Sequence, residues 1–297
     1  MTPPSMPVQH SEPIRHSEAR YRLQRSVGRV ALYALMVCIA LIVIIPLLWM
    51  LSTSFKLKSQ LFSREIYWIP KVITLENYTK ILNNPSTPIA LWFRNSVIVA
   101  TLTTVAKLAL DSLAGYGYAR LEFPGRKQLF GLLLATLFLP GVMFLVPNFV
   151  TVARLGMLNK FSGAIVPALA SVFGVYFMRQ FFLSIPKELE EAAAIDGANT
   201  FQIFFQIVLP LAKPALATLA VIEFLGSWND FLWALLVLKD RAVQTLQPGL
   251  RTLQGAYTSE YGLMMAGAVI VALPVLLLYA FLQRYVVESV ATTGLKG

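Results

Sequence analysis

Long apolar runs alternate with short polar segments along this chain. The first run fills residues 30–51, and five more apolar windows follow it. Each window is long enough for a helix that crosses the ~30 Å hydrocarbon layer, which takes about 20 mainly apolar residues. The pattern predicts an all-α membrane protein with six transmembrane helices and both ends on one side. The later windows are residues 95–118, 128–147, 161–182, 214–238 and 263–286.

Composition agrees with this class. Hydrophobic residues make up 57% of the chain and charged residues 13%, which leaves no room for a large soluble catalytic domain. The formal net charge is +10, but basic membrane proteins place Lys and Arg against anionic lipid headgroups, so we do not expect nucleic acid as a partner. Cys38 is the single cysteine, and His10 and His16 lie in the N-terminal arm, so we expect no disulfide and no metal site.

The windows divide the chain into segments. The start of the chain lacks apolar periodicity, so we expect a disordered arm. Five arginines before the first apolar run, at positions 15, 20, 22, 25 and 29, favour a cytoplasmic N-terminus, although Lys and Arg in the first outer loop make the charge difference between the two sides small. The first run is too long for the apolar core of a cleaved signal peptide. The expected segments are a cytoplasmic arm at 1–28, a first transmembrane helix at 29–51, an extracytoplasmic loop at 52–94, a five-helix core at 93–287 and a cytoplasmic tail at 288–297.

An acidic segment interrupts the apolar pattern between the fourth and fifth windows. Ser184 supplies a capping hydroxyl and Pro186 follows in the first turn, which predicts the start of a helix over residues 186–196. Carboxylates stabilise the positive end of such a helix. Those carboxylates belong to Glu188, Glu190 and Glu191.

A second helix is predicted directly after the first. Gly197 can end the first helix in the left-handed conformation, and Thr200 can cap the second. Pro210 and Pro214 are expected to interrupt that second helix. Residues 186–214 therefore form a helix–turn–helix elbow outside the bilayer, either as a docking element for a protein or as an amphipathic interfacial loop. Small residues that would allow close approach of a partner are Ala192, Ala193, Ala194 and Ala198.

Charged residues inside the second window form a predicted pair. Lys107 and Asp111 are four residues apart, so they share a helix face and can neutralise each other. We interpret them as a structural pair, with a place on a solute path as the alternative. Four glycines are expected at sites of close helix packing. They are Gly115, Gly117, Gly163 and Gly174.

The fifth window carries a second group of polar residues. Aromatic faces, amides and carboxylates are the groups that bind sugars, and this window contains all three. We expect a solute path or gate there; the alternative is an interfacial aromatic belt of Trp228 and Trp233 with Asp230 near the outer water. The candidate path residues are Glu223, Trp228, Asn229 and Asp230.

The elbow resembles the EAA loop of ABC importer permeases. That pattern is Glu-Ala-Ala, three residues, Gly, nine residues, Ile, one residue and Leu-Pro, and residues 191–210 match each named position. The longer form over residues 191–198 is similar to that of carbohydrate-uptake permeases related to the maltose, multiple-sugar and glycerol-phosphate importers. The resemblance covers roughly residues 93–297. Further matching segments are Asn95-Ser96, residues 119–125, residues 228–231 and Lys296-Gly297.

This resemblance implies a type I ABC importer permease fold in the bacterial inner membrane. It implies that the elbow sits in a groove on a separate ATPase subunit, and that the partners are two ATPase subunits, a second homologous permease, an extracytoplasmic solute-binding protein, a sugar substrate and membrane lipid. The chain has no phosphate-binding loop, so ATP and Mg²⁺ belong to the partner and this chain itself binds no cofactor. The implied coupling residues are Glu190, Glu191, Ala192, Ala193, Asp196, Gly197, Ala198, Leu209 and Pro210.

Three rival functions remain at this point. An ion-coupled secondary carrier would need a coupling-ion site, for which Lys107, Asp111 and Glu223 are available. A membrane-embedded enzyme would need a catalytic constellation that the sequence lacks. An importer of glycerol 3-phosphate or a polyol would need a cationic lining. Lys107 is the one cation within the predicted spans that lies away from a span end, since Arg179 and Arg284 lie within three residues of theirs.

The elbow generates a first prediction. Gly197→Pro removes the left-handed turn, and Glu191→Lys reverses a charge near the start of the first helix. Both variants are expected to abolish solute uptake while leaving the amount of protein in the membrane unchanged, as measured by labelled-solute uptake and immunoblotting of membranes. Near-normal uptake by both would contradict a coupling role.

Overall fold

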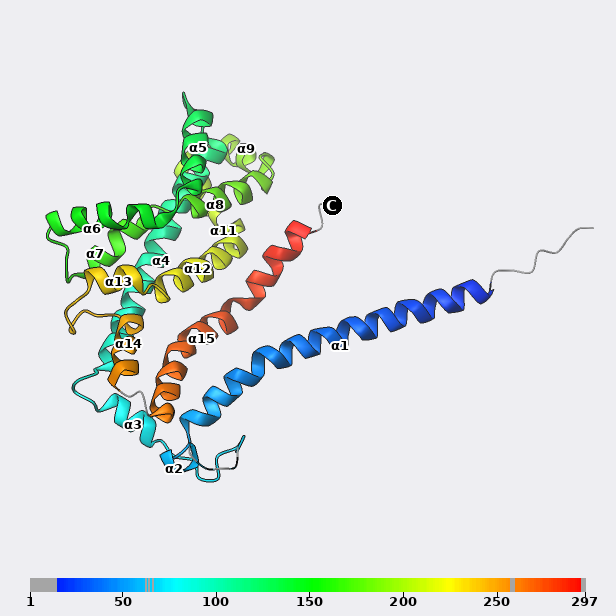
Figure 1. Cartoon of the computed structure of the whole chain (residues 1–297). Helices are drawn as coiled ribbons and strands as arrows, with labels where there is room; N and C mark the ends of the chain where they lie inside the picture. The colour runs from blue at the N-terminus through cyan, green and yellow to red at the C-terminus, as the bar shows by residue number, and fades with distance from the viewer. Residues whose placement is uncertain (1–14, 62, 64, 66, 257–259, 295–297) are drawn as a thin grey trace, which may run out of the picture.

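The computed structural model describes the backbone outside residues 1–14, 62, 64, 66, 257–259 and 295–297, and the side chains outside these and outside residues 15–26, 252–256, 282 and 284–294. Throughout this described part the regular elements are helices and no strand occurs, which confirms the predicted all-α class (Figure 1). Three long helices are uninterrupted: α1 (Arg15–Ser54), α4 (Ile89–Arg120) and α15 (Tyr261–Gly294). Each contains a stretch long and apolar enough to cross a membrane.

The remaining helices are shorter. They are α2 (Lys58–Leu61), α3 (Glu76–Leu82), α5 (Arg126–Ala135), η1 (Thr136–Phe138), η2 (Gly141–Phe144), α6 (Leu145–Arg154), α7 (Phe161–Ile165), η3 (Val166–Leu169), α8 (Val172–Ser184), α9 (Glu188–Ile195), α10 (Thr200–Ile203), the π-helical η4 (Phe204–Val208), α11 (Leu209–Leu211), α12 (Lys213–Trp228), α13 (Leu232–Val237) and α14 (Leu246–Ala256).

Three pairs of these shorter segments are bent candidate spans. The bends are 96° between Arg126–Phe138 and Gly141–Arg154, 48° between Phe161–Leu169 and Val172–Ser184, and 76° between Thr200–Leu211 and Lys213–Trp228. Proline is one cause of these bends, because it lacks the N–H donor that a continuous helix needs. Pro140 lies in the first break, and Pro214 lies in the first turn of the helix that follows the third break. By length and composition, the described helices provide up to six crossings.

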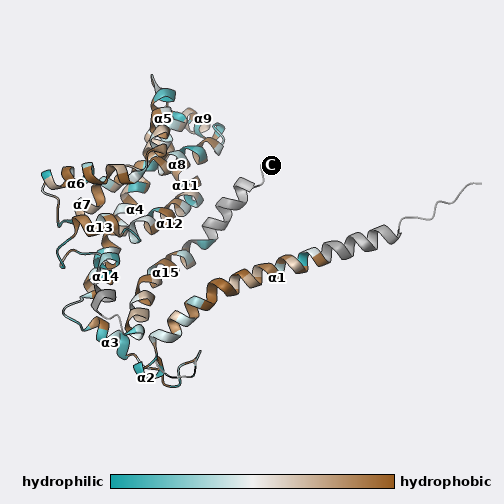
Figure 2. Ribbon diagram, in the orientation of Figure 1, coloured by the Kyte–Doolittle hydropathy of each residue, from teal (hydrophilic) through white to brown (hydrophobic). Residues whose placement is uncertain are grey.

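The N-terminal arm differs from the prediction. Helix α1 begins at Arg15, so the predicted disorder of residues 1–28 is wrong from residue 15 onward, and residues 1–14 lie outside the described part. Arg, Glu, Ala, Leu and Gln are good helix formers, and adding turns to an existing helix avoids the cost of nucleation. Helix α1 contacts α15 and diverges from the other helices toward its own N-terminus, and the visible side of its membrane stretch is mostly hydrophobic (Figures 1 and 2).

The fifth apolar window also differs. Residues 214–238 are not one helix, because α12 ends at Trp228 and α13 starts at Leu232. The Asp230 carboxylate accepts a hydrogen bond from the Trp233 N–H at 3.2 Å, which stabilises a new helix start. Hydropathy alone does not reveal this break because both sides of it are apolar.

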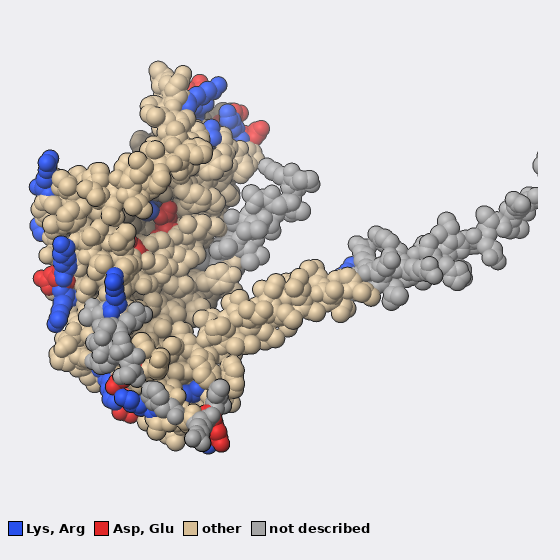
Figure 3. Space-filling view, in the orientation of Figure 1, with Lys and Arg blue, Asp and Glu red and all other residues tan. Residues whose placement is uncertain are grey.

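Helix α4 lies at the centre of the packing. It contributes to three buried apolar clusters, which include Tyr116, Trp92 and Val99 respectively. The cluster around Tyr116, here called the inner cluster, joins α4 to α8, η4 and α12 through residues such as Phe182 and Phe204. Charged side chains lie at the top, along the left edge and at the bottom of the view, with a few acidic and basic atoms near its centre, and most of the remaining visible surface is uncharged (Figure 3).

Two glycines of α4 have different surroundings. A Cβ on Gly115 would lie 2.9 Å from the Met178 Cβ and 3.0 Å from the Arg179 backbone nitrogen in α8. A Cβ on Gly117 would meet no atom within 4 Å. Close packing is therefore confirmed at Gly115, and also at Gly163 and Gly174, but the same expectation is wrong for Gly117.

This contrast predicts opposite effects of the same substitution. Gly115→Ala forces α4 and α8 apart and is expected to lower the free energy of unfolding by about 1–3 kcal/mol. Gly117→Ala, the matched control in the same helix, is expected to raise it by up to about 1 kcal/mol because Ala favours helix. Denaturant unfolding in detergent measures both, and equal effects would contradict the described packing.

Candidate functional site

The first helix of the elbow is exposed and begins later than the sequence predicts. Helix α9 (Glu188–Ile195) starts after Lys187, without a side-chain cap. The Ser184 hydroxyl donates to the Phe181 carbonyl at 2.7 Å, within α8, so the prediction that Ser184 caps the elbow is wrong. Because α8 continues to Ser184, its hydroxyl bonds back to its own helix.

The turn after α9 is the one predicted. Gly197 has φ +88°, which confirms the left-handed helix end. The cap of the second helix is Asn199 rather than Thr200: its Oδ1 accepts from the Gln202 N–H at 2.9 Å, and Gln202 Oε1 accepts from the Asn199 N–H at 2.8 Å. This reciprocal pair is a capping box, and the Asn-x-x-Gln spacing is the signal that could have identified it.

Pro210 does not interrupt the second helix as predicted. The chain stays helical from Thr200 to Leu211, with the π-helical segment η4 directly before the proline. A π-helical turn accommodates a residue that lacks an N–H donor. The break falls instead at Ala212, and Pro214 lies in the first turn of α12.

The elbow presents apolar and acidic side chains together. Ile195 is 86% exposed and Phe201 is 73% exposed, and both lie near the exposed Glu191 and Asp196 in the chain. Exposed apolar side chains of this size are less favourable in water than in contact with a groove on another protein. Among the predicted coupling residues, Ala192, Gly197 and Pro210 are also exposed, whereas Ala193, Ala198 and Leu209 are half-buried against the inner cluster.

Glu190 points inward rather than outward. Its Oε1 accepts from Arg120 Nε at 2.5 Å, and its Oε2 accepts from the Tyr116 hydroxyl at 3.2 Å. Arg120 Nη2 also donates to the Ile185 carbonyl at 2.7 Å. Arg120 therefore ties the elbow to the end of α4. Sequence reasoning gave Arg120 no part in the site, because its partner is 70 residues away.

A second buried charge group lies between α4, α8 and α12. Lys107 forms an ion pair and hydrogen bond with Glu223 Oε2, and the Ser171 hydroxyl donates to Glu223 Oε1 at 3.0 Å. The predicted Lys107–Asp111 pair is therefore wrong, because the crossing of α12 brings a carboxylate closer to Lys107. Asp111 lies instead against Gly174, where a Cβ would be 1.8 Å from its Oδ2.

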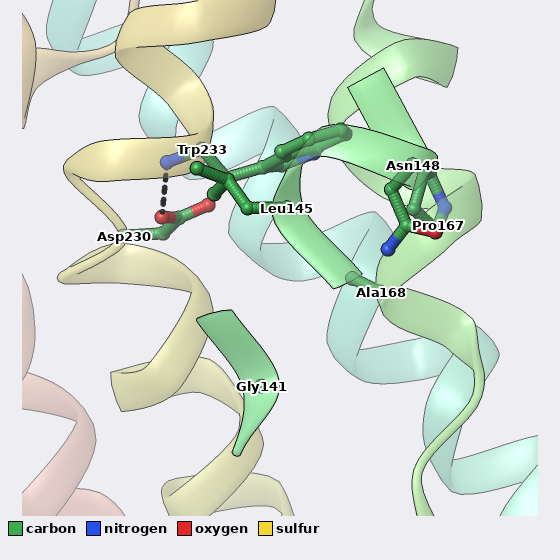
Figure 4. Close-up of a pocket in the computed structure, with 7 residues that line it drawn as sticks. All are labelled: Gly141, Leu145, Asn148, Pro167, Ala168, Asp230 and Trp233. Atoms are coloured by element: carbon green, nitrogen blue, oxygen red, sulfur yellow. Dashed lines mark hydrogen bonds between the residues drawn. The ribbon is translucent and has the colours of Figure 1, made fainter. Parts of the chain in front are cut away.

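A cavity of about 290 Å³ lies beside this ion pair. It is lined by Val99, Thr103, Lys107, Ala164, Ala168, Gly226, Ser227, Asp230, Ala234 and Thr245. A neighbouring pocket of about 230 Å³ shares Ala168 and Asp230 with it and adds Asn148 and Trp233 (Figure 4). Hydroxyls, an amide, a carboxylate and an indole thus meet at adjoining spaces formed at the helix breaks.

The candidate path residues have different positions. Asp230 and Lys107 line the cavity, and Glu223 lies behind Lys107 with 7% exposure. Trp228 is 2% exposed, stacks on Phe224 and donates from its indole to the Val271 carbonyl at 3.2 Å, so it belongs to the core rather than to an interfacial belt.

The other two polar residues of this region are less buried. Asn229 is exposed, and its Oδ1 accepts from Gln247 Nε2 at 3.1 Å. Trp233, which sequence reasoning considered only as part of a belt, lines the smaller pocket and donates to the Gly163 carbonyl at 3.1 Å.

Comparison with known proteins identifies the family. A family model described as "Binding-protein-dependent transport system inner membrane component" matches residues 111–292. The chain belongs to this family. As a binding-protein-dependent transport component it is a membrane-embedded permease, and the matched region includes the elbow, the Glu223 ion-pair residue and Asp230.

Several proteins resemble this permease over most of its length. It is 35% identical to the arabinooligosaccharides transport system permease protein AraQ of Bacillus subtilis, over 94% of this chain and 99% of that protein. It is also 35% identical to the diacetylchitobiose uptake system permease protein NgcG of Streptomyces coelicolor, over 87% of this chain and 86% of that one. A chain of a bacterial ABC transporter involved in the import of alginate, an acidic polysaccharide, has a TM-score of 0.77 and 26% identity, over 89% of this permease and 98% of that chain.

The buried ion pair generates a prediction. Lys107→Met leaves the Glu223 charge unpaired in the protein interior, so the free energy of unfolding is expected to fall by about 3–5 kcal/mol. Lys107→Met combined with Glu223→Gln removes both charges and should recover most of that loss. Denaturant unfolding in detergent measures each variant, with the exposed Lys127→Met as control. A double variant no more stable than the single one would contradict the pairing.

Proposed function

We propose that this chain is one of two permease subunits of an ATP-driven importer that carries an oligosaccharide across the bacterial inner membrane. The observation that carries this proposal is that permeases named for arabinooligosaccharides and for diacetylchitobiose match nearly the whole chain. The substrate class rests on those relatives, and the mechanism rests on the elbow and the cavity.

In this proposal the elbow is the docking element for a separate ATPase. Its exposed apolar and acidic side chains, including Ile195 and Glu191, fit a groove on a folded protein. ATP hydrolysis and Mg²⁺ binding take place on two such ATPase subunits, since this chain lacks a phosphate-binding loop. Closure of the ATPases would draw the elbows of two permeases together and switch the helices between outward and inward access.

The cavity suits a neutral polyhydroxyl solute. Asp230, Ser227, Thr103 and Thr245 offer hydrogen-bonding groups to sugar hydroxyls. Glycerol 3-phosphate is a poorer fit, because Lys107 is already neutralised by Glu223 and Asp230 adds negative charge at the same wall. The same pairing disfavours an ion-coupled carrier, in which Lys107 and Glu223 would have to be free to titrate.

The proposed assembly gives each face of the molecule a partner. Both termini face the cytoplasm, with the ATPases at the elbow. The solute-binding protein docks on the opposite face, at residues 77–88, which include most of α3, and at residues 239–256, which include α14. The second permease and lipid cover the exposed apolar surfaces of the membrane helices, such as that of α1.

Uptake measurements with different energy sources test the function. Cells that carry the complete transporter are expected to accumulate labelled arabinooligosaccharides or chitooligosaccharides but not glycerol 3-phosphate. Depleting ATP should stop uptake, whereas a protonophore applied at constant ATP should not. Uptake that follows the proton gradient would move the assignment to a secondary carrier.

The cavity wall generates a further prediction. Asp230→Asn is expected to lower the maximal uptake rate at least tenfold. The substitution replaces a charged hydrogen-bond acceptor for sugar hydroxyls by a neutral amide, at a residue that lines both the cavity and the neighbouring pocket. Glu122→Gln, at an exposed carboxylate in the segment between α4 and α5, serves as the control. An unchanged uptake rate in Asp230→Asn would exclude this residue from the path.

A further inference from the structure

We propose that Arg120 is the positioning residue that transmits movement of helix α9 to helix α4, and that Glu190 serves this internal link rather than contacting the ATPase. The inference rests on the proposed coupling function of the elbow. It changes the role expected for Glu190 and adds Arg120, which the EAA pattern does not contain.

Both oxygens of the Glu190 carboxylate are already bound within the chain. Arg120 Nε donates to Oε1 at 2.5 Å and the Tyr116 hydroxyl donates to Oε2 at 3.2 Å. The Arg120 side chain is 6% exposed and that of Glu190 is 13% exposed. By contrast, the neighbouring Glu191 is exposed, and its side chain makes no hydrogen bond or ion pair in the described structure. A partner protein therefore reaches Glu191 and not Glu190.

Arg120 fixes two points of the elbow at once. Besides Glu190, it binds the Ile185 carbonyl through Nη2 at 2.7 Å, just before α9 begins. The planar guanidinium presents its donors in a fixed fork, so the two acceptors cannot shift independently. The entry to α9 and its first turn are thus held in one orientation relative to α4.

The two halves of the elbow are attached to the membrane helices in different ways. The second half is held by apolar packing, since Ile203, Phe204 and Val208 are buried in the inner cluster. The larger apolar side chains of α9, Leu189 and Ile195, are exposed. Within the described structure, Glu190 is the residue through which α9 makes side-chain hydrogen bonds to a membrane helix.

Helix α4 connects this link to the cavity without a break. It runs from Ile89 to Arg120, and its Lys107 and Thr103 line the cavity. Lys107 lies about 20 Å from Arg120 at a rise of ~1.5 Å per residue. The two covalent routes out of the elbow are less direct. The route into α12 passes through a 76° bend at Ala212, and the route back through α8 crosses the non-helical Ile185–Pro186 and a 48° bend between Leu169 and Val172 before it reaches the cavity-lining Ala168. A rotation of α9 therefore reaches the cavity most directly through Arg120.

The test uses the complete reconstituted transporter and measures solute transported per ATP hydrolysed. Arg120→Gln is expected to lower this ratio at least tenfold while ATPase subunits still co-purify and ATP hydrolysis continues. Arg126→Gln is the matched control, since Arg126 lies near the same end of α4 but its side chain bonds only the Leu121 carbonyl in the described structure. The exchanged pair Arg120→Glu with Glu190→Arg should restore part of the ratio.

A merely structural role gives a different result. If Arg120→Gln lowers transport and ATP hydrolysis in proportion, or leaves the ratio at the wild-type value, the inference is overturned. Should Arg120→Gln fail to accumulate, Arg120→Lys replaces it. This variant keeps the charge but cannot hold both acceptors, so an intermediate ratio is expected and a wild-type ratio overturns the inference. Failure of the proposed function shows separately, because wild-type protein would then co-purify with no ATPase.

Discussion

An ionised side chain within a membrane protein is stable where an opposite charge faces it, and α4 meets this condition twice. Lys107 pairs with Glu223 of α12, and Arg120 pairs with Glu190 of α9. In the described structure, these are the ion pairs in which both side chains are largely buried; the other pairs are more exposed. Separating such a pair would leave a buried charge without a partner or solvent, at a high cost in free energy. This cost holds α12 and α9 in position against α4.

The breaks in the helices have a complementary role. Hydrocarbon does not tolerate unsatisfied backbone groups, but a cavity inside the protein does. Two of the bends lie near Pro140 and Ser171, and a separate interruption at Asn229 divides α12 from α13. Residues beside these three interruptions line the two adjoining spaces. The uninterrupted helices satisfy their own backbone groups, whereas the broken helices place polar groups where a solute can reach them.

Local sequence signals were sufficient for part of this arrangement. The apolar windows predicted the membrane helices, and Gly197 predicted a left-handed turn because glycine adopts positive φ at little cost. The spacing of the elbow motif identified the family. Each of these signals depends on residues close together in the chain.

The predictions that were wrong about charged partners concern residues far apart in the chain. Lys107 was paired with Asp111 because they are neighbours on one helix, while its partner Glu223 is 116 residues away. Arg120 and Glu190 are likewise 70 residues apart. The position along α4 at which another helix contacts it depends on how whole helices pack together. The hydrophobic periodicity of one segment carries no information about that position. The cap at Asn199 was a different kind of miss, since its signal is local.

Helix α1 has a consequence for the biogenesis of the molecule. The most apolar window of its membrane stretch, Val27–Ser54, has a mean hydropathy of 2.9, and none of that window is buried by the rest of the described chain. The free energy of placing α1 in the bilayer therefore comes from lipid alone and is available before any later helix has been synthesised. Helix α1 precedes the other described helices in the chain and needs none of them in order to insert, so it can hold the nascent chain at the membrane while the charge-bearing helices pack together.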